Sequence, residues 1–158
     1  MKGTFAKHLV FSYGTLKRGF PNHHIMERIG ASYLTDALTI GKYPLLLAGK
    51  WNTPFMIQKK GHPDSHHVSG ELYRLDDKGL SVLDEFEGVH RSYYRRSKIN
   101  LSTQDEKKSS EQAWCYFRYE ATDDLLADPS RFIACFGPEA AKEYVPVNSR
   151  PEDWHIDP

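Results

Sequence analysis

One glutamate, Glu87, stands where an acidic side chain is costly. It follows a segment in which apolar residues recur at helical spacing, namely Leu80, Val82, Leu83 and Phe86. At about 100° per residue, the side chain of Glu87 falls within this apolar stripe, whereas Glu85 faces solvent. Burial, the last helical turn and the nearby charge of Asp84 would all raise the pKa of Glu87. A carboxyl group with a raised pKa suits general acid–base catalysis near neutral pH.

A purely structural interpretation of Glu87 stays open. Its side chain could turn outward from a frayed last turn, or it could form an ion pair with Arg95 or Arg96.

The second candidate group is the loop after the first apolar run. Leu9–Phe11 predicts a buried strand, and the sequence continues as Tyr13-Gly14-Thr15-Leu16-Lys17-Arg18-Gly19 before Pro21–Asn22, where a helix can start with Asn22 as its cap. The two glycines permit backbone conformations and close approaches that other residues do not. Successive amide N–H groups ahead of a helix form a concavity suited to a carboxylate or phosphate. The alternative is an ordinary turn with Lys17 and Arg18 as surface charges.

Alternation and turn residues predict the elements that hold these groups. Helices are expected at residues 22–29 and from Asp76–Asp77 to about Glu87, closed by Gly88. Strands are expected at residues 31–40, 43–49, 55–57, 68–75, 93–101 and 112–119, with a mobile hairpin loop at 102–111. Beyond residue 123 short helices or irregular chain should follow, ending in a tail at 146–158. The pattern favours a single α+β domain over residues 1–158.

The charge balance of the chain limits the classes of partner that it is expected to bind. The chain has 158 residues, and 21 Lys and Arg balance 21 Asp and Glu, so no net field favours nucleic acid or an anionic membrane. We expect a small-molecule partner and favour a monomer. No apolar run approaches the roughly 20 residues that cross a bilayer, and residues 1–8 do not resemble a signal peptide, which favours a cytoplasmic protein.

Cysteine and histidine do not suggest a metal or a cofactor. Cys115 and Cys135 are expected to be buried structural thiols, because their spacing suits neither a disulfide framework nor a zinc site. His62, His66 and His67 lie near one another but match no recognised set of ligands. We therefore expect a solvated loop there.

Several blocks in combination resemble one family. They are Tyr13–Gly19 with Pro21–Asn22, Tyr43–Leu45, Gly70–Tyr73, Leu83–Glu87, and Tyr93 with Arg95, in this order between about Leu9 and Tyr119. With them the chain resembles the gamma-glutamylcyclotransferase-like (AIG2-like) family, most of all its gamma-glutamylamine cyclotransferases. The resemblance implies a small mixed, mostly antiparallel β-barrel with flanking helices. Residues 89–92 depart from relatives, which often carry a proline there.

The resemblance also implies roles. Tyr13, Gly14, Thr15 and Leu16 would hold the glutamyl end of a substrate, Glu87 would be the catalytic acid and base, and Tyr93 would line the pocket, with Arg95 as a weaker candidate. The implied reaction converts a γ-glutamyl amine, such as γ-glutamyl-ε-lysine, to 5-oxoproline and free amine. The substrate's own α-amine attacks its γ-carbonyl, so the protein needs a base and no nucleophile. Action on γ-glutamyl amino acids, or a non-catalytic protein-interaction scaffold, are the alternatives.

Overall fold

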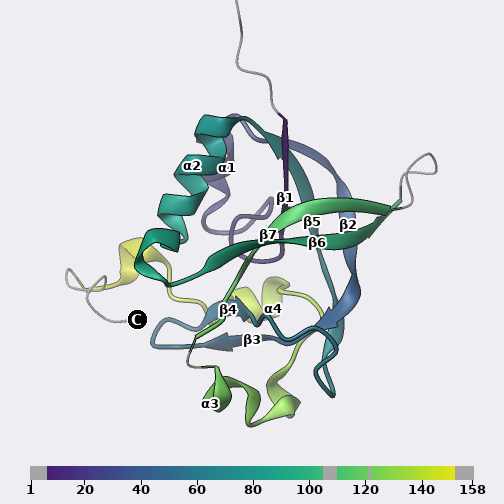
Figure 1. Ribbon diagram of the computed structural model, residues 1–158. Helices are drawn as coiled ribbons and strands as arrows, with labels where there is room; N and C mark the ends of the chain where they lie inside the picture. The colour runs from purple at the N-terminus through teal and green to yellow at the C-terminus, as the bar shows by residue number, and fades with distance from the viewer. Residues whose placement is uncertain (1–6, 105–109, 121, 152–158) are drawn as a thin grey trace, which may run out of the picture.

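Five strands of the computed structural model, which describes residues 7–104, 110–120 and 122–151, close into a barrel in the order β1-β5-β2-β6-β7 (Figure 1). Their bounds are β1 His8–Ser12, β2 Ser32–Tyr43, β5 His66–Leu75, β6 Arg95–Thr103 and β7 Ser110–Phe117. Four neighbouring pairs are antiparallel, and β1 closes the barrel by pairing parallel with β7 through Val10 and Trp114. The predicted mixed, mostly antiparallel barrel is confirmed.

Strand β5 is central because it pairs with both β1 and β2. Val68, Gly70 and Leu72 are buried on it, as the alternation predicts. A Cβ atom at Gly70 would lie 2.4 Å from the backbone oxygen of Ser12. Glycine therefore lets β1 and β5 approach closely just before the chain enters the Tyr13–Gly19 loop.

Alternate residues of the barrel strands pack into two apolar clusters. One cluster joins strand residues such as Val10 and Tyr73 to residues of helices α1 and α2, so it fills the space between barrel and helices. The other contains Phe11, Leu72 and Phe117 with further strand residues. Strands β1, β5 and β7 contribute buried side chains to both clusters, whereas the buried residues of β6, Ile99 and Leu101, belong to the second cluster alone.

Two helices follow β1 and β5. Helix α1 spans His23–Arg28, and α2 spans Asp77–Phe86. The carboxylate of Asp76 accepts a hydrogen bond from the N–H of Gly79 at 2.8 Å and caps α2, as predicted. Val82 is only partly buried, so the buried face of α2 is narrower than predicted. Asn22 occupies the cap position of α1, but its side chain makes no capping hydrogen bond, contrary to the prediction.

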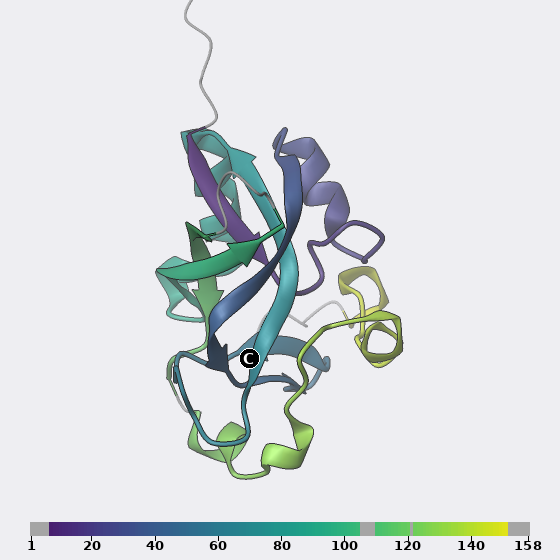
Figure 2. The same cartoon turned by 90° about the vertical axis from the view of Figure 1, so that its right-hand side faces the viewer.

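A two-stranded hairpin and a run of short helices complete the fold. The hairpin pairs β3 Leu45–Ala48 with β4 Thr53–Met56. Then come α3 Asp123–Leu126, a 3-10 turn at Pro129–Arg131, α4 Pro138–Ala141 and a 3-10 turn at Val147–Ser149. Residues 132–151, here called the C-terminal segment, run beside the loop after β1 (Figure 2). None of the helices described is long and apolar enough to cross a membrane.

Some expected boundaries differ from those observed. Strand β6 continues to Thr103 and β7 begins at Ser110, so the hairpin connection is shorter than predicted because pairing extends into its polar flanks. The predicted mobile loop falls largely on residues 105–109, which lie outside the described part of the chain. Residues 1–6, where no signal peptide was expected, and residues 152–158 of the predicted tail also lie outside it.

Candidate active site

A cavity of about 270 Å³ lies beside the end of α2. Its walls come from β1 and the loop after it, from the residues that follow α2, from the β3–β4 hairpin and from the C-terminal segment. This volume is near the lower end of the range for small-molecule pockets, roughly 300–1,000 Å³. The cavity therefore suits a small molecule.

Glu87 lines this cavity from the carboxyl-terminal cap of α2. Within the described part of the chain, its carboxyl group has neither a hydrogen-bond nor an ion-pair partner. Burial raises the pKa of Glu87 to about 8, and the nearby charge of Asp84 adds to the rise. The predicted direction of this pKa change is therefore found in the structure, together with two of its three predicted causes, burial and the charge of Asp84.

The ion pairs that could have neutralised Glu87 are formed elsewhere. Arg96 donates two hydrogen bonds to Asp84, at 2.8 and 3.0 Å, and the hydroxyl of Tyr116 donates a third at 2.7 Å. Arg95 donates to the side chain of Gln58. The alternative in which Glu87 is only a partner of Arg95 or Arg96 is therefore wrong.

The loop after β1 presents unpaired backbone donors to the same cavity. Gly14, Thr15 and Leu16 line it, and in the described chain their amide N–H groups donate to no protein acceptor. The loop is held by other groups, since the carbonyl oxygens of Gly14 and Thr15 accept from the N–H groups of Lys17 and Asn22 at 3.2 and 2.9 Å. Donors in a fixed loop of this kind can bind an anion.

The glycines of this loop have different roles. Gly19 has φ of +83°, which favours glycine. Gly14 instead permits a close approach, because a Cβ atom there would lie 2.9 Å from Cγ of Pro54. Both roles agree with the prediction.

Tyr13 lines the cavity but also has a structural role. It is buried, and its hydroxyl donates to the backbone oxygen of Tyr116 at 2.7 Å. Burial raises the pKa of Tyr13, with smaller contributions from Cys115 and Glu87. Its hydroxyl therefore remains protonated and orients the start of the loop.

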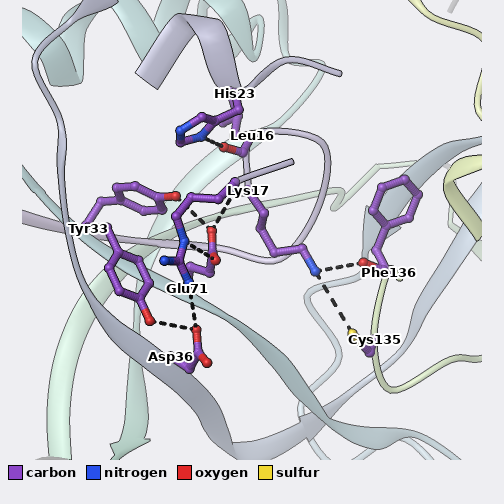
Figure 3. A network of polar contacts seen from close by, with 10 residues as sticks. Leu16, Lys17, His23, Tyr33, Asp36, Glu71, Cys135 and Phe136 are labelled. Atoms are coloured by element: carbon purple, nitrogen blue, oxygen red, sulfur yellow. Dashed lines mark hydrogen bonds and ion pairs between the residues drawn. The ribbon is translucent and has the colours of Figure 1, made fainter. Parts of the chain in front are cut away.

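The prediction that Lys17 is a surface charge is wrong. The residue is 6% exposed, and its Nζ donates to the backbone oxygen of Phe136 at 2.7 Å and lies 4.0 Å from Sγ of Cys135 (Figure 3). The long side chain extends from the loop into the C-terminal segment, where the carbonyl compensates for burial of the ammonium. Cys135, expected to be buried, is exposed because this segment runs along the surface. Cys115 is buried as expected.

Arg18 is exposed as predicted but is not isolated. Its N–H and its Nε donate to the two carboxylate oxygens of Glu71, each at 2.9 Å, and the hydroxyl of Tyr73 donates to the same carboxylate at 2.7 Å. Burial alone would raise the pKa of Glu71, but these hydrogen bonds outweigh burial and lower it. The network fixes the loop to the centre of β5.

Tyr93 lines the cavity, whereas Arg95 does not. The ring of Tyr93 lies against the guanidinium of Arg118 at 4.5 Å, and Nη1 of Arg118 donates to the backbone oxygen of Tyr93 at 2.8 Å. Tyr93 precedes β6 and is not part of it, contrary to the predicted strand bounds. The structural interpretation of Arg95 as a surface charge therefore fits better than a place in the pocket.

The sequence analysis did not assign several of the lining residues to the site, among them Trp51, Arg91, Tyr144, Val147 and Arg150. Arg91 lies in residues 89–92, where the sequence departs from relatives, and this departure was the one sequence signal that pointed to any of these residues. Trp51 comes from a turn, Tyr144 from the region predicted as short helices or irregular chain, and Val147 and Arg150 from the predicted tail. Among the described residues, no group of three or more His, Cys, Asp or Glu could hold a metal ion.

A family model described as gamma-glutamyl cyclotransferase, AIG2-like, matches residues 10–131. The chain belongs to this family. It is 35% identical over 161 residues to an Arabidopsis thaliana protein provisionally named a gamma-glutamylcyclotransferase, with 91% of this chain and 84% of that protein aligned. It is 37% identical over 129 residues to gamma-glutamylaminecyclotransferase C of Danio rerio, covering 78% of this chain and 83% of that one.

The fold of this AIG2-like chain is that of its solved relatives. The crystal structure of an AIG2-like protein from Mus musculus matches it with a TM-score of 0.77 at 32% identity, covering 91% of this chain and 100% of that chain. The predicted family and fold are confirmed, and with them the prediction of an enzyme of the cyclotransferase type. The matched residues 10–131 contain Glu87 and the Gly14–Leu16 amides, but not Tyr144 or Arg150.

Proposed function

We propose that this protein is a gamma-glutamylamine cyclotransferase that converts γ-glutamyl amines, such as γ-glutamyl-ε-lysine, to 5-oxoproline and free amine, with Glu87 as general acid and base. One observation carries the proposal. An unpaired carboxyl group with a pKa of about 8 lines the same cavity as three residues whose backbone N–H groups have no acceptor in the described chain. The relative from Danio rerio, by its name, supports the amine branch of the family.

Glu87 suits the first proton transfer. The α-ammonium of a γ-glutamyl substrate must lose a proton before its nitrogen can attack. A base works best when its pKa lies near the working pH, and burial brings the pKa of Glu87 into that range. Glu87 in its ionised form therefore takes the proton and stores it.

The amides of Gly14, Thr15 and Leu16 suit the binding of the substrate's α-carboxylate. Once that carboxylate is fixed, the substrate can fold so that its α-nitrogen contacts its γ-carbonyl carbon. Correct orientation of an intramolecular attack is worth up to roughly 7–11 kcal/mol in ideal cases. An N–H of the same loop can also stabilise the negative charge that develops on the carbonyl oxygen.

No protein group forms a covalent bond to the substrate in this reaction. The α-nitrogen forms a bond to the γ-carbon, and the bond from that carbon to the leaving nitrogen breaks. Glu87 returns its proton to the leaving nitrogen. Its carboxylate then takes the second proton, which the attacking nitrogen loses as the ring amide forms, and passes it to the departing amine or to water, so the amine departs as an ammonium or the proton enters solvent. A cysteine nucleophile is not needed, and burial raises the pKa of Cys115 while Cys135 does not line the cavity.

The experiment is to incubate the purified protein with γ-glutamyl-ε-lysine and with γ-glutamyl-alanine and to measure 5-oxoproline. We expect product from the lysine isopeptide. Product from γ-glutamyl-alanine alone would replace the amine branch with the amino acid branch. Product from neither would favour the non-catalytic scaffold and contradict the proposal.

A matched pair of variants tests the role of Glu87. Glu87→Gln keeps the size of the side chain, and we expect turnover to fall by at least the roughly 100-fold of a lost acid–base group. Glu85→Gln, an exposed change on the same helix, is the control and should retain activity. Full activity in Glu87→Gln would remove Glu87 from the mechanism.

A further inference from the structure

The cavity contains a second group of donors that the proposed reaction does not use. The side chains of Arg91, Arg150 and Trp51 line it from three different segments. The indole Nε1 of Trp51 is buried and has no hydrogen-bond acceptor among the described residues. A buried donor without a partner at a cavity wall is a position where a ligand acceptor gains a hydrogen bond.

Arg150 is held in place rather than extended into solvent. Its Nε donates to the backbone oxygen of Val145 at 2.9 Å, and one terminal nitrogen donates to the hydroxyl of Tyr144 at 3.1 Å. Its guanidinium carbon lies 5.2 Å from the ring centre of Trp51 and 5.5 Å from that of Tyr144. A guanidinium flanked by rings and fixed by hydrogen bonds is pre-organised for a carboxylate.

Arg91 adds a positive charge to the cavity wall and forms no ion pair with Glu87 in the described chain. Its guanidinium folds back over Gly88, since a Cβ at Gly88 would lie 3.0 Å from Nη2. The described residues provide no acceptor for this side chain. Glu87 is the single acidic side chain among the described lining residues, so the walls carry an excess of positive charge.

Tyr93 lies between the influence of Arg150 and that of Glu87, because both charges affect its pKa. Glu87 contributes to raising the pKa of Tyr93, after burial, while Arg150 contributes to lowering it. The phenol of Tyr93 therefore lies within electrostatic reach of both groups. The pKa of Glu87 itself is set by burial and Asp84, with no contribution from either arginine of the cavity.

We propose that Arg150, with Arg91 and the indole N–H of Trp51, binds a carboxylate at the far end of the leaving amine, as in ε-linked lysine, and so selects such γ-glutamyl amines over conjugates of simple amines or diamines. This inference rests on the proposed function. The Gly14–Leu16 amides already provide donors for the substrate's α-carboxylate, so a second cationic group matches a second anion. A diamine conjugate would instead bring a terminal ammonium toward two guanidinium groups.

Two conjugates of equal length isolate this effect. In γ-glutamyl-6-aminohexanoate the leaving amine ends in a carboxylate, and in γ-glutamylcadaverine it ends in an ammonium. We expect kcat/KM of the wild-type protein to be at least tenfold higher for the first. In Arg150→Gln, kcat/KM for the carboxylate conjugate should fall at least tenfold and that for the diamine conjugate should rise, because a repulsive charge is removed. Arg74→Gln, an exposed change outside the cavity, is the control.

A second variant separates charge from structure, because Arg150 also fixes the C-terminal segment. Arg91→Gln disturbs no described contact and should shift the preference in the same direction. Equal kcat/KM for both conjugates in the wild-type protein would overturn the inference and leave the proposed function intact. An equal loss for both in Arg150→Gln would assign Arg150 to the glutamyl end or to folding, and would also overturn it. Product from neither conjugate, nor from γ-glutamyl-ε-lysine, would instead remove the proposed function itself.

Discussion

Replacing Glu87 with glutamine should stabilise the protein while it removes the proton transfer. In the folded state, burial keeps Glu87 protonated up to a pKa of about 8, compared with an ordinary value of 4.5. The unfolded chain releases this proton at lower pH. Between about pH 4.5 and pH 8 the folded state therefore binds more protons than the unfolded state, and the free energy of unfolding falls as pH rises.

The size of the effect follows from the same pKa difference. At about 1.4 kcal/mol per pKa unit, the rise to about 8 corresponds to at most about 5 kcal/mol of lost stability above pH 8. Water that enters the cavity would reduce this value. Glutamine has no proton to lose, so the advantage of Glu87→Gln should be near zero below pH 4.5, grow up to about pH 8 and remain constant above it.

Urea unfolding at pH 4.5, 6.5 and 8.5 would measure this trend for the wild-type protein and Glu87→Gln. Glu85→Gln is the control, because Glu85 is exposed on the same helix. Its stability should follow that of the wild-type protein at every pH. A difference between Glu87→Gln and the wild-type protein that does not change with pH would refute the argument that burial raises the pKa of Glu87.

Three further changes test other parts of the site. Asp84→Asn removes a charge that raises the pKa of Glu87, so the acid limb of kcat/KM against pH should move to lower pH; an unmoved limb would contradict this coupling. Gly14→Val places a side chain against Pro54 and should weaken binding of 5-oxoproline, measured by calorimetry, at least tenfold; normal binding would remove the amides as the anion site. Lys17→Met loses a buried hydrogen bond and should lower the free energy of unfolding in urea by about 1–3 kcal/mol, whereas unchanged stability would show that the bond contributes nothing.

The elements near the site were predictable because local chemistry fixes them. The spacing of Leu80, Leu83 and Phe86 placed Glu87 on the core-facing side of a helix end, and Asp76 marked the start of that helix. The glycines of the first loop indicated a close approach and a left-handed conformation, and both are found. These signals act over a few residues and need no knowledge of distant partners.

The errors concern residues whose surroundings come from far along the chain. Lys17 is buried because Phe136 provides a carbonyl oxygen, and no local pattern predicts a partner 119 residues away. Asn22 leaves its expected capping role because its side chain donates to Thr15 and to the hydroxyl of Tyr144. The same holds for Arg150, which a tail without periodic pattern gave no reason to place in the cavity.

The cavity is built from two stretches of chain that can vary separately. Glu87 and the amide donors belong to residues 10–131, which match the family model, while Tyr144 and Arg150 belong to the C-terminal segment outside it. Changing that segment could therefore select a new amine while Glu87, the proposed proton-transfer group, stays in place. A chimera whose residues 132–151 come from another family member should inherit that member's choice of amine and still close the five-membered ring.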